Sequence, residues 1–417
     1  MRVLSNPPRL VYAPGRAVSK FRFAVHPISS SEAESSVAAK SETVPNMKPS
    51  TKNQSTAQGN RPVINWPAAS PDPARVAVIL FCPKGVNPPA DFQEGIDRLA
   101  DYTDDFILNG LRRWNHEPAT KTLFRRKGEH VEVLGVVGKN GPDDYTDASV
   151  HKEAIAAAQS HYRIAPKTHI WWVLGFKGDP PLRFEGFKGG TSPEFGGWAV
   201  ANFDSRAKQL RPGMSLGSPV LKDMALKGMI HELGHALRLP HLGPRSELKL
   251  GNTLMGPTHA NFRRVTGRDE PQAYLSQAAA AMLSAHPVIR NRQLTRTSVP
   301  SVNLTEGELI SEPGGKTVHL RGRIESNRQP LFAIAGNHDD SLPGQYWVRH
   351  YVSPVDQQGR FDIEVTQPQP SDGELRLCFI FINGEITGNG KQQGPAQTTN
   401  IPYRFDGGRW VLSETAG

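Results

Sequence analysis

The segment HELGHALRLPH, from His231 to His241, constrains the fold and chemistry of this chain more than any other. His231 and His235 are four residues apart, so on a helix they lie about 40° apart on one face, one turn above the other. Two imidazoles at that spacing can share one zinc ion. Glu232 projects about 100° away from His231, where its carboxylate can accept a proton from a zinc-bound water. The segment therefore predicts a helix that carries a zinc site with an adjacent general base.

A third ligand requires the chain to leave this helix. Pro240 disfavours helical geometry at the residue before it, so we expect the helix to cover residues 219–238 and to end there. The following turn can then bring His241 back to the metal. Glu247 and Glu270 are alternative third ligands, because a downstream carboxylate completes other zinc sites of this kind.

Upstream of the histidines, strand-like and helix-like patterns alternate. Runs of β-prone apolar residues predict strands, and apolar residues at helical spacing predict amphipathic helices. The predicted strands cover residues 76–81, 131–137 and 168–176, the predicted helices cover 90–114, 149–162 and 272–285, and the glycine-rich residues 186–204 are expected to form an irregular edge strand or strand pair. This order predicts one α/β layer with a mixed sheet.

Beyond residue 300 the pattern changes to short strands separated by Gly, Pro and Asn turns. These strands are predicted at residues 316–324, 345–352, 360–366, 374–382 and 409–412. Such a pattern is typical of an all-β sandwich. We therefore expect a zinc-binding domain over residues 75–295, followed by an immunoglobulin- or fibronectin-III-like sandwich over residues 300–417.

Residues 1–74 are basic and rich in Ser and Pro, with few bulky apolar side chains, which predicts a disordered segment. In the whole chain, 49 Lys and Arg against 40 Asp and Glu give a net charge of +9. No basic block or nucleic-acid-binding motif accompanies this charge. We therefore expect no nucleic-acid partner, whereas a polyanionic or cell-envelope partner would suit it.

The chain has two cysteines, Cys82 and Cys378, and both lie in apolar, strand-like runs. Buried free thiols are expected, because two distant cysteines make neither a disulfide framework nor a redox motif. No stretch approaches the ~18 consecutive apolar residues of a membrane helix, so no transmembrane segment is expected.

The histidine motif and the residues after it resemble the metzincin clan of zinc metallopeptidases, and within it the matrixin-like branch. The family pattern is HExxHxxGxxH, followed by a turn whose methionine lies beneath the zinc. The segment NTLMG is similar to that Met-turn, with Met255 fourteen residues after His241. Arg238 replaces the glycine that normally ends the helix with a positive φ, a conformation that costs a non-glycine residue about 1 kcal/mol.

The resemblance implies an α+β catalytic domain, with a mixed twisted sheet and long helices, ahead of the sandwich. It also implies that an extended substrate pairs with the edge strand that carries Trp198, Ala199 and Val200. His259, four residues after Met255, is a candidate for contact with the substrate, although a histidine in a surface loop is favoured there. In this family the location would be secreted or in the cell envelope, with the cytoplasm as the alternative.

We therefore expect a zinc-dependent endopeptidase that acts on a protein or peptide substrate, with one catalytic zinc ion. The alternative is a protein that holds zinc but is catalytically inactive, a binding or adhesion protein whose sandwich carries the function. The acidic turn with Asp143, Asp144 and Asp147 would offer calcium a site, although a solvated turn is favoured there.

Overall fold

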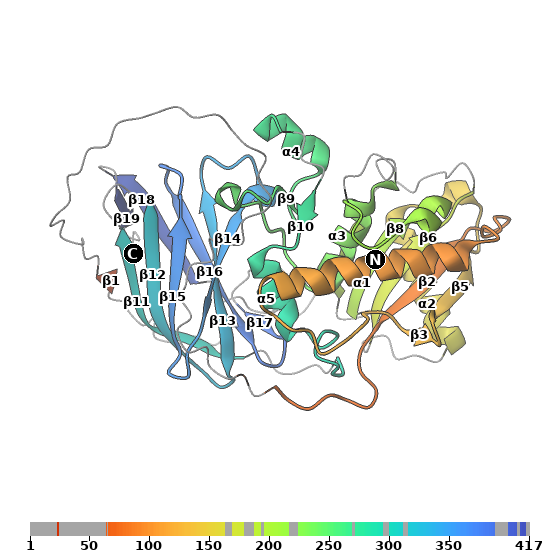
Figure 1. Ribbon diagram of the computed structural model, residues 1–417, viewed down its shortest axis with the longest axis horizontal. Helices are drawn as coiled ribbons and strands as arrows, with labels where there is room; N and C mark the ends of the chain where they lie inside the picture. The colour runs from red at the N-terminus through yellow and green to blue at the C-terminus, as the bar shows by residue number, and fades with distance from the viewer. Residues whose placement is uncertain are drawn as a thin grey trace, which may run out of the picture.

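The structure is a computed structural model. It describes residues 23–24, 64, 66–162, 169–178, 187–192, 196–216, 224–268, 272–294, 300–311, 316–387, 399–406 and 409–413. Most of the predicted disordered segment, residues 1–74, lies outside these residues. Its last part is ordered, because the Ser70 N–H donates to the Asn291 carbonyl at 2.7 Å and the Ala74 N–H donates to the Arg292 carbonyl at 2.8 Å. We call residues 66–294 the N-terminal half and residues 300–413 the C-terminal half, and Figure 1 shows them side by side.

A five-stranded mixed sheet forms the centre of the N-terminal half. Its strands lie in the order β5 (Val133–Val137), β2 (Val76–Cys82), β6 (Ile170–Gly175), β8 (Gly196–Asn202) and β7 (Lys188–Ser192). The first four are parallel and β7 runs antiparallel to β8. Every residue of β2 and β6 is buried. Their continuous apolar sequences are explained by this position, because helices cover both faces of a sheet of this kind.

Helices pack on both faces of this sheet. Helix α2 (Asp147–Tyr162) covers one face, while α1 (Phe92–Arg113), α3 (Leu226–Ala236) and α5 (Gln277–Ala285) contribute to the core on the other. The helix predicted at 219–238 is shorter in the structure, because Ala225 has a positive φ of 51° and α3 begins after it and ends at Ala236. Residues 217–223 lie outside the described part.

Shorter elements connect these. They are β3 (Arg126–Lys127), β4 (His130–Val131), β9 (Asn252–Thr253), β10 (Ala273–Tyr274), α4 (His259–Thr266) and the 3-10 helices η1 (Pro142–Asp144), η3 (Ser205–Gln209) and η5 (Ser246–Leu248). The prediction of a helix from residue 272 was wrong at its start. Residues 273–274 pair with β9 as strand β10, and α5 begins only after the N-cap Ser276, whose side chain accepts a hydrogen bond from the Ala279 N–H.

The C-terminal half consists of two sheets packed face to face, as the predicted sandwich requires. One sheet holds β11 (Val302–Ser311), β12 (Thr317–Ser326) and β15 (Arg360–Thr366), with the short β1 (Phe23–Ala24) beside β11. The other holds β14 (Arg349–Pro354), β13 (Pro330–Asp339), β16 (Gly373–Phe381), β18 (Thr399–Asp406) and β19 (Arg409–Leu412), and β17 (Ile386–Thr387) pairs with β16. Side chains from both sheets share one core, for example Leu320, Ile363 and Phe379.

The predicted strand at residues 345–352 was wrong in its first part. Residues Gln345–Trp347 form a 3-10 turn, η6, and the strand β14 begins only at Arg349. Gly344 precedes the turn with a φ of 138°, a conformation that residues with a side chain rarely adopt. The chain therefore leaves the sheet here, and the turn lies against the N-terminal half.

The two halves share a continuous apolar core. Phe332, Ile334, Cys378 and Ile380, on the outer face of β13 and β16, belong to the same buried cluster as the side chains of α5. Burial on both faces explains why β13 and β16 have nearly continuous apolar sequences. Cys82 and Cys378 are buried free thiols, as predicted.

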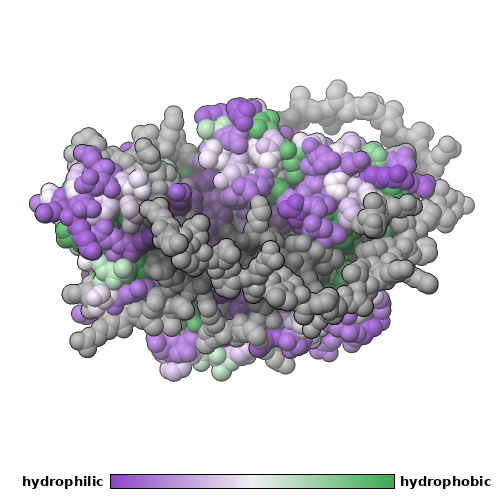
Figure 2. Space-filling model, turned by 180° about the vertical axis from the view of Figure 1, so that it is seen from behind, coloured by the Kyte–Doolittle hydropathy of each residue, from purple (hydrophilic) through white to green (hydrophobic). Residues whose placement is uncertain are grey.

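The exterior of the described part is mostly polar. On the face shown in Figure 2, hydrophobic residues form only small patches among hydrophilic ones. Within the described residues, no helix has both the length and the apolar character needed to cross a membrane.

Candidate metal centre

Helix α3 ends in a left-handed turn at Arg238, as the sequence predicted. The φ of Arg238 is 70°. The Leu239 N–H donates to the Gly234 carbonyl at 2.9 Å, and the Arg238 N–H donates to the His235 carbonyl at 3.0 Å. These two bonds form a Schellman motif, the usual way in which a left-handed residue ends a helix. The chain reverses here, and this brings His241 against His231 and His235 of the helix.

The three predicted histidines come together. His231, His235 and His241 each offer a ring nitrogen, and these atoms lie within 4.8 Å of one another. The Nε2 atoms of His235 and His241 are 3.2 Å apart. Within the described residues, this is the group of His, Cys, Asp or Glu side chains that could hold a metal ion. An all-histidine donor set of this size fits zinc.

Burial prepares these imidazoles for metal binding. It lowers the pKa of His231 to about 3 and the pKa of His241 to about 4, and it also lowers the pKa of His235. Neutral imidazole is the form that binds a metal. Because the rings stay neutral over the physiological pH range, no proton has to leave before a metal enters.

Glu232 lies beside the histidines, with its side chain partly buried. Burial raises the pKa of its carboxyl to about 7, against a hydrogen bond from the Gly189 N–H that acts to lower it. The strand β7 approaches the helix very closely here, because a Cβ on Gly189 would lie 2.2 Å from the Glu232 carbonyl oxygen. A carboxylate with a pKa near 7 is well matched to general-base catalysis at neutral pH.

Met255 packs beneath the helix and is 1% exposed. Its sulfur lies so close to Gly234 that a Cβ there would be 2.5 Å away. The turn is fixed by Lys227, whose Nζ donates to the carbonyls of Gly256 at 3.1 Å and Pro257 at 2.8 Å. Burial lowers the pKa of Lys227 to about 7. Sequence reasoning missed Lys227, although its place one turn before His231 was a signal.

The predicted substrate strand needs a correction. Trp198, Ala199 and Val200 lie on β8, which pairs with β6 on one side and β7 on the other. Ala199 and Val200 are at most 1% exposed. The outer strand on this side of the sheet is β7, so substrate pairing at this edge would have to use that strand. His259 is the first residue of α4 and is not among the three histidines that converge.

The alternative ligands are not part of this group. Glu247 lies in η5, where its carboxylate accepts hydrogen bonds from Arg245 and Thr366. Glu270 lies outside the described residues. At the acidic turn, where the sequence favours a solvated turn over a calcium site, the Asp144 carboxylate accepts a hydrogen bond from the Gly141 N–H at 3.2 Å.

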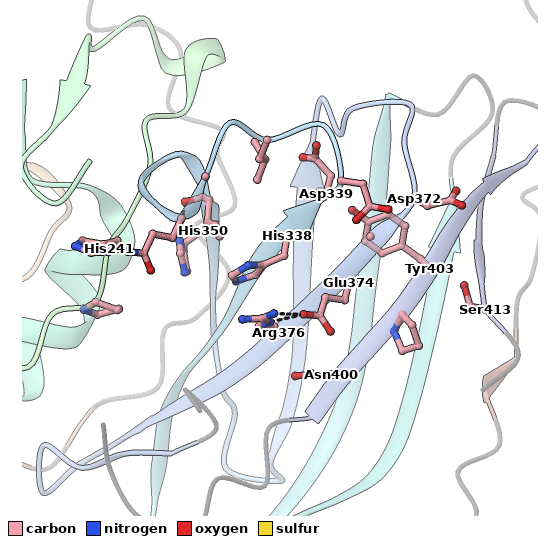
Figure 3. Close-up of a pocket in the computed structure, with 18 of the residues that line it drawn as sticks. His241, His338, Asp339, His350, Asp372, Glu374, Arg376, Asn400, Tyr403 and Ser413 are labelled. Atoms are coloured by element: carbon pink, nitrogen blue, oxygen red, sulfur yellow. Dashed lines mark hydrogen bonds and ion pairs between the residues drawn. The ribbon is translucent and has the colours of Figure 1, made fainter. Parts of the chain in front are cut away.

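A large cleft opens from the histidines across the C-terminal half. Its volume is about 900 Å³, and it is lined at one end by His235, Arg238 and His241. Figure 3 shows the cleft from His241 to its opposite end, which is lined by polar residues of β13, β16 and β18. They include His338, Asp339, Glu374, Arg376, Asn400 and Tyr403. Sequence reasoning missed this wall, because its residues are spread over three strands that come together only in the folded sheet.

The cleft wall is held rigid by contacts within the protein. Asp339 has a fully buried carboxylate that accepts hydrogen bonds from Ser341 and Ser371 and pairs with Arg349 at 3.5 Å. Glu374 pairs with Arg376. The Tyr403 hydroxyl donates to Asn337 at 2.6 Å. A wall of fixed polar groups suits a polar ligand whose hydrogen-bonding groups must be placed accurately.

The comparisons with known proteins match the fold. No protein-family model and no curated protein matches the sequence. The solved structures do match. Wild-type OgpA from Akkermansia muciniphila has a TM-score of 0.63 at 17% identity, with 84% of this chain and 98% of that chain covered. A second crystal form of wild-type OgpA gives a TM-score of 0.58 at 16% identity, over 82% and 97% of the two chains.

A catalytically inactive OgpA in complex with an O-glycopeptide substrate, glycodrosocin, also matches. Its TM-score is 0.59 at 15% identity, with 84% of this chain and 98% of that chain covered. At this level of identity, the similarity extends to the fold of both halves.

Proposed function

We propose that this chain is a zinc-dependent peptidase, and that the three histidines hold the metal while Glu232 moves the proton. The observation that carries the proposal is the convergence of three neutral imidazoles beside a carboxylate whose pKa is raised to about 7. The fold shared with OgpA, an enzyme crystallised with an O-glycopeptide substrate, supports the same class of reaction.

Zinc held by His231, His235 and His241 would polarise the scissile carbonyl and lower the pKa of a water molecule. The proton transfers then fall to Glu232. Its carboxylate accepts a proton from the attacking water and returns it to the amine that leaves when the C–N bond breaks. The Gly189 N–H, which hydrogen-bonds this carboxylate, keeps it oriented through both transfers.

We further propose that the substrate is a glycopeptide, since the large polar cleft beside the histidines has room for a bulky substituent. Glu374 and Asn400 keep part of their side chains exposed on this wall, and their carboxylate and amide groups can hydrogen-bond sugar hydroxyls. The two cleft arginines are already paired, Arg238 with Glu385 and Arg376 with Glu374, so the wall offers little attraction to an anionic ligand.

The test uses two peptides of the same sequence, one carrying an O-glycan and one unmodified, with the full-length zinc-loaded protein. We expect cleavage of the glycopeptide, its loss after chelation and its recovery when zinc is added back. Equal cleavage of both peptides would reject the proposal that the glycan is recognised and would support the proposal that the protein is a peptidase. If zinc-loaded protein cleaves neither of these peptides nor a denatured protein, the inactive binding protein becomes the better description.

A further inference from the structure

The two histidines on the helix are oriented by the N-terminal half. The Nδ1 of His231 lies 2.9 Å from the Leu254 carbonyl oxygen, and the Nδ1 of His235 lies 2.7 Å from the Leu239 carbonyl oxygen. Each ring can donate its Nδ1–H there, which leaves Nε2 for a metal. Contacts of this kind fix the tautomer and the rotation of a ligating imidazole.

The third histidine is oriented by the other half of the molecule. His241 lies after the helix, and its ring is hydrogen-bonded by the side chain of Gln345 in η6. The next residue, Tyr346, places its ring centroid 3.9 Å from that of His241 and 6.2 Å from that of His231. The C-terminal half therefore contacts the third imidazole through two consecutive residues.

This turn is firmly attached to the N-terminal half. The Gly243 N–H donates to the Val348 carbonyl at 2.7 Å. Trp347 stacks on Phe262 with a centroid distance of 5.8 Å and an interplanar angle of 7°. The backbones are so close that a Cβ on Gly243 would lie 2.4 Å from the Trp347 carbonyl carbon. The position of Gln345 and Tyr346 is thus set by contacts on both sides of the boundary between the halves.

We propose that Gln345 and Tyr346 are positioning residues for the third metal ligand, so that the C-terminal half completes a metal centre whose ligands all belong to the N-terminal half. The proposal rests on the proposed function only in requiring that His241 bind the metal. Gln345 fixes the rotation of the His241 ring, and Tyr346 limits its tilt. His241 needs this support more than the other two, because it lies on a turn rather than on the helix.

The first test measures zinc affinity of the full-length protein by competition with a chromophoric chelator. Gln345→Met keeps the length of the side chain and removes its hydrogen bond, so we expect affinity to fall about 10–100-fold, the usual cost of losing such a partner. Gln345→Glu keeps an acceptor and should bind zinc nearly as well as the wild type. Gln357→Met, at an exposed position of the same half, is the matched control.

The second test asks whether Gln345 acts through His241. We expect His241→Ala to weaken zinc binding, and Gln345→Met to cause no further loss in that background, because effects that share one partner are not additive. For the neighbouring ring, Tyr346→Phe should retain the affinity and Tyr346→Ala should lower it. The melting temperature of each metal-free variant shows whether its fold is intact.

Three results would overturn the proposal. Gln345→Met with wild-type zinc affinity would do so, as would an equal loss in Gln345→Glu, which would assign the effect to packing. So would a full additional loss in the His241→Ala background. These outcomes differ from failure of the peptidase proposal, in which the zinc-loaded wild type cleaves no peptide while the same affinity differences are still measured.

Discussion

The two halves of the molecule contribute different things to the candidate site. Among the described residues, the N-terminal half supplies the three histidines and Glu232, whereas the C-terminal half supplies no metal ligand. The C-terminal half instead contacts the residues around the site: Gln345 and Tyr346 contact His241, and Glu385 pairs with Arg238. The chemistry is thus concentrated on one helix and its following turn, while the orientation of that turn depends on a second, all-β half.

This division separates the expected effects of mutations. A change in the group that transfers protons should alter turnover and leave metal binding and folding intact. A change at the boundary between the halves should alter metal affinity or stability. The predictions below use that separation, beginning with the largest expected effect.

The largest effect is expected at Glu232, the only residue assigned to proton transfer rather than to metal binding. Glu232→Gln keeps the size of the side chain and removes the base, so peptide hydrolysis should fall about 10²–10⁴-fold while zinc content is retained. A quenched-fluorescence peptide and elemental analysis measure the two quantities. Glu129→Gln, in an exposed turn, is the control. Wild-type turnover in Glu232→Gln would assign hydrolysis to another group.

The sequence predicted the part of the site in the N-terminal half well, because the patterns that indicate it are local. His231 and His235 follow from a four-residue spacing, and the positive φ of Arg238 follows from its place at the glycine position of the motif. The turn that returns His241 to the metal was predicted for the same reason. In each case the residues that determine the geometry lie within one or two helical turns of one another.

The contacts that the C-terminal half makes with the site could not be predicted, because they join residues that are distant in the sequence. Gln345 and Glu385 are more than 100 positions from the residues that they contact, and nothing in their neighbourhood marks them as functional. The order of strands is a similar case. The sequence predicted an edge strand or a strand pair over residues 186–204, and the structure has the pair, β7 and β8. It placed Trp198–Val200 at the edge, but β7 lies outside β8, and glycine-rich stretches do not reveal which of two adjacent strands is outermost.

A second prediction concerns acid and the boundary between the halves. His286 is 2% exposed and accepts a hydrogen bond from the Val288 N–H at 3.3 Å. The turn around Gly384 packs directly on residues 285–287. Burial, together with the charges of Arg238 and Arg292, lowers the pKa of His286 to about 3 from its usual 6.5. Acid should therefore change the free energy of unfolding through this histidine, which lies at the boundary between the halves.

The direction of the stability change follows from proton binding in the folded and unfolded states. Between pH 6.5 and about pH 3, the unfolded chain binds a proton at this histidine and the folded chain does not. Stability must then fall as the pH falls, by up to ~1.4 kcal/mol per pH unit for one proton. His286→Asn keeps an acceptor for Val288 and should lose less stability on acidification. Unfolding of metal-free wild type and His286→Asn at pH 7.5, 6 and 5 measures this. Equal acid sensitivity in wild type and His286→Asn would exclude His286 as the cause.

The smallest effect is expected at Arg238, where the two halves are joined by an ion pair. Its guanidinium lies 3.3 Å from the Glu385 carboxylate, and the two side chains are 23% and 12% exposed. The positive φ of Arg238 should cost about 1 kcal/mol relative to glycine, so from the sequence alone Arg238→Gly is expected to stabilise the fold. The ion pair changes that expectation, because the same substitution removes the partner of a largely buried carboxylate.

A double-mutant cycle separates the two effects. In a Glu385→Gln background the ion pair is already lost, so Arg238→Gly should raise the free energy of unfolding by up to ~1 kcal/mol through relief of strain. In the wild type the gain should be smaller or reversed, and the difference between the two backgrounds should be about 0.5–1 kcal/mol. Denaturant unfolding of the four proteins gives this coupling. Equal effects in both backgrounds would mean that Arg238 does not link the halves, and that the turn after the metal helix is held by the N-terminal half and by the turn that carries Gln345.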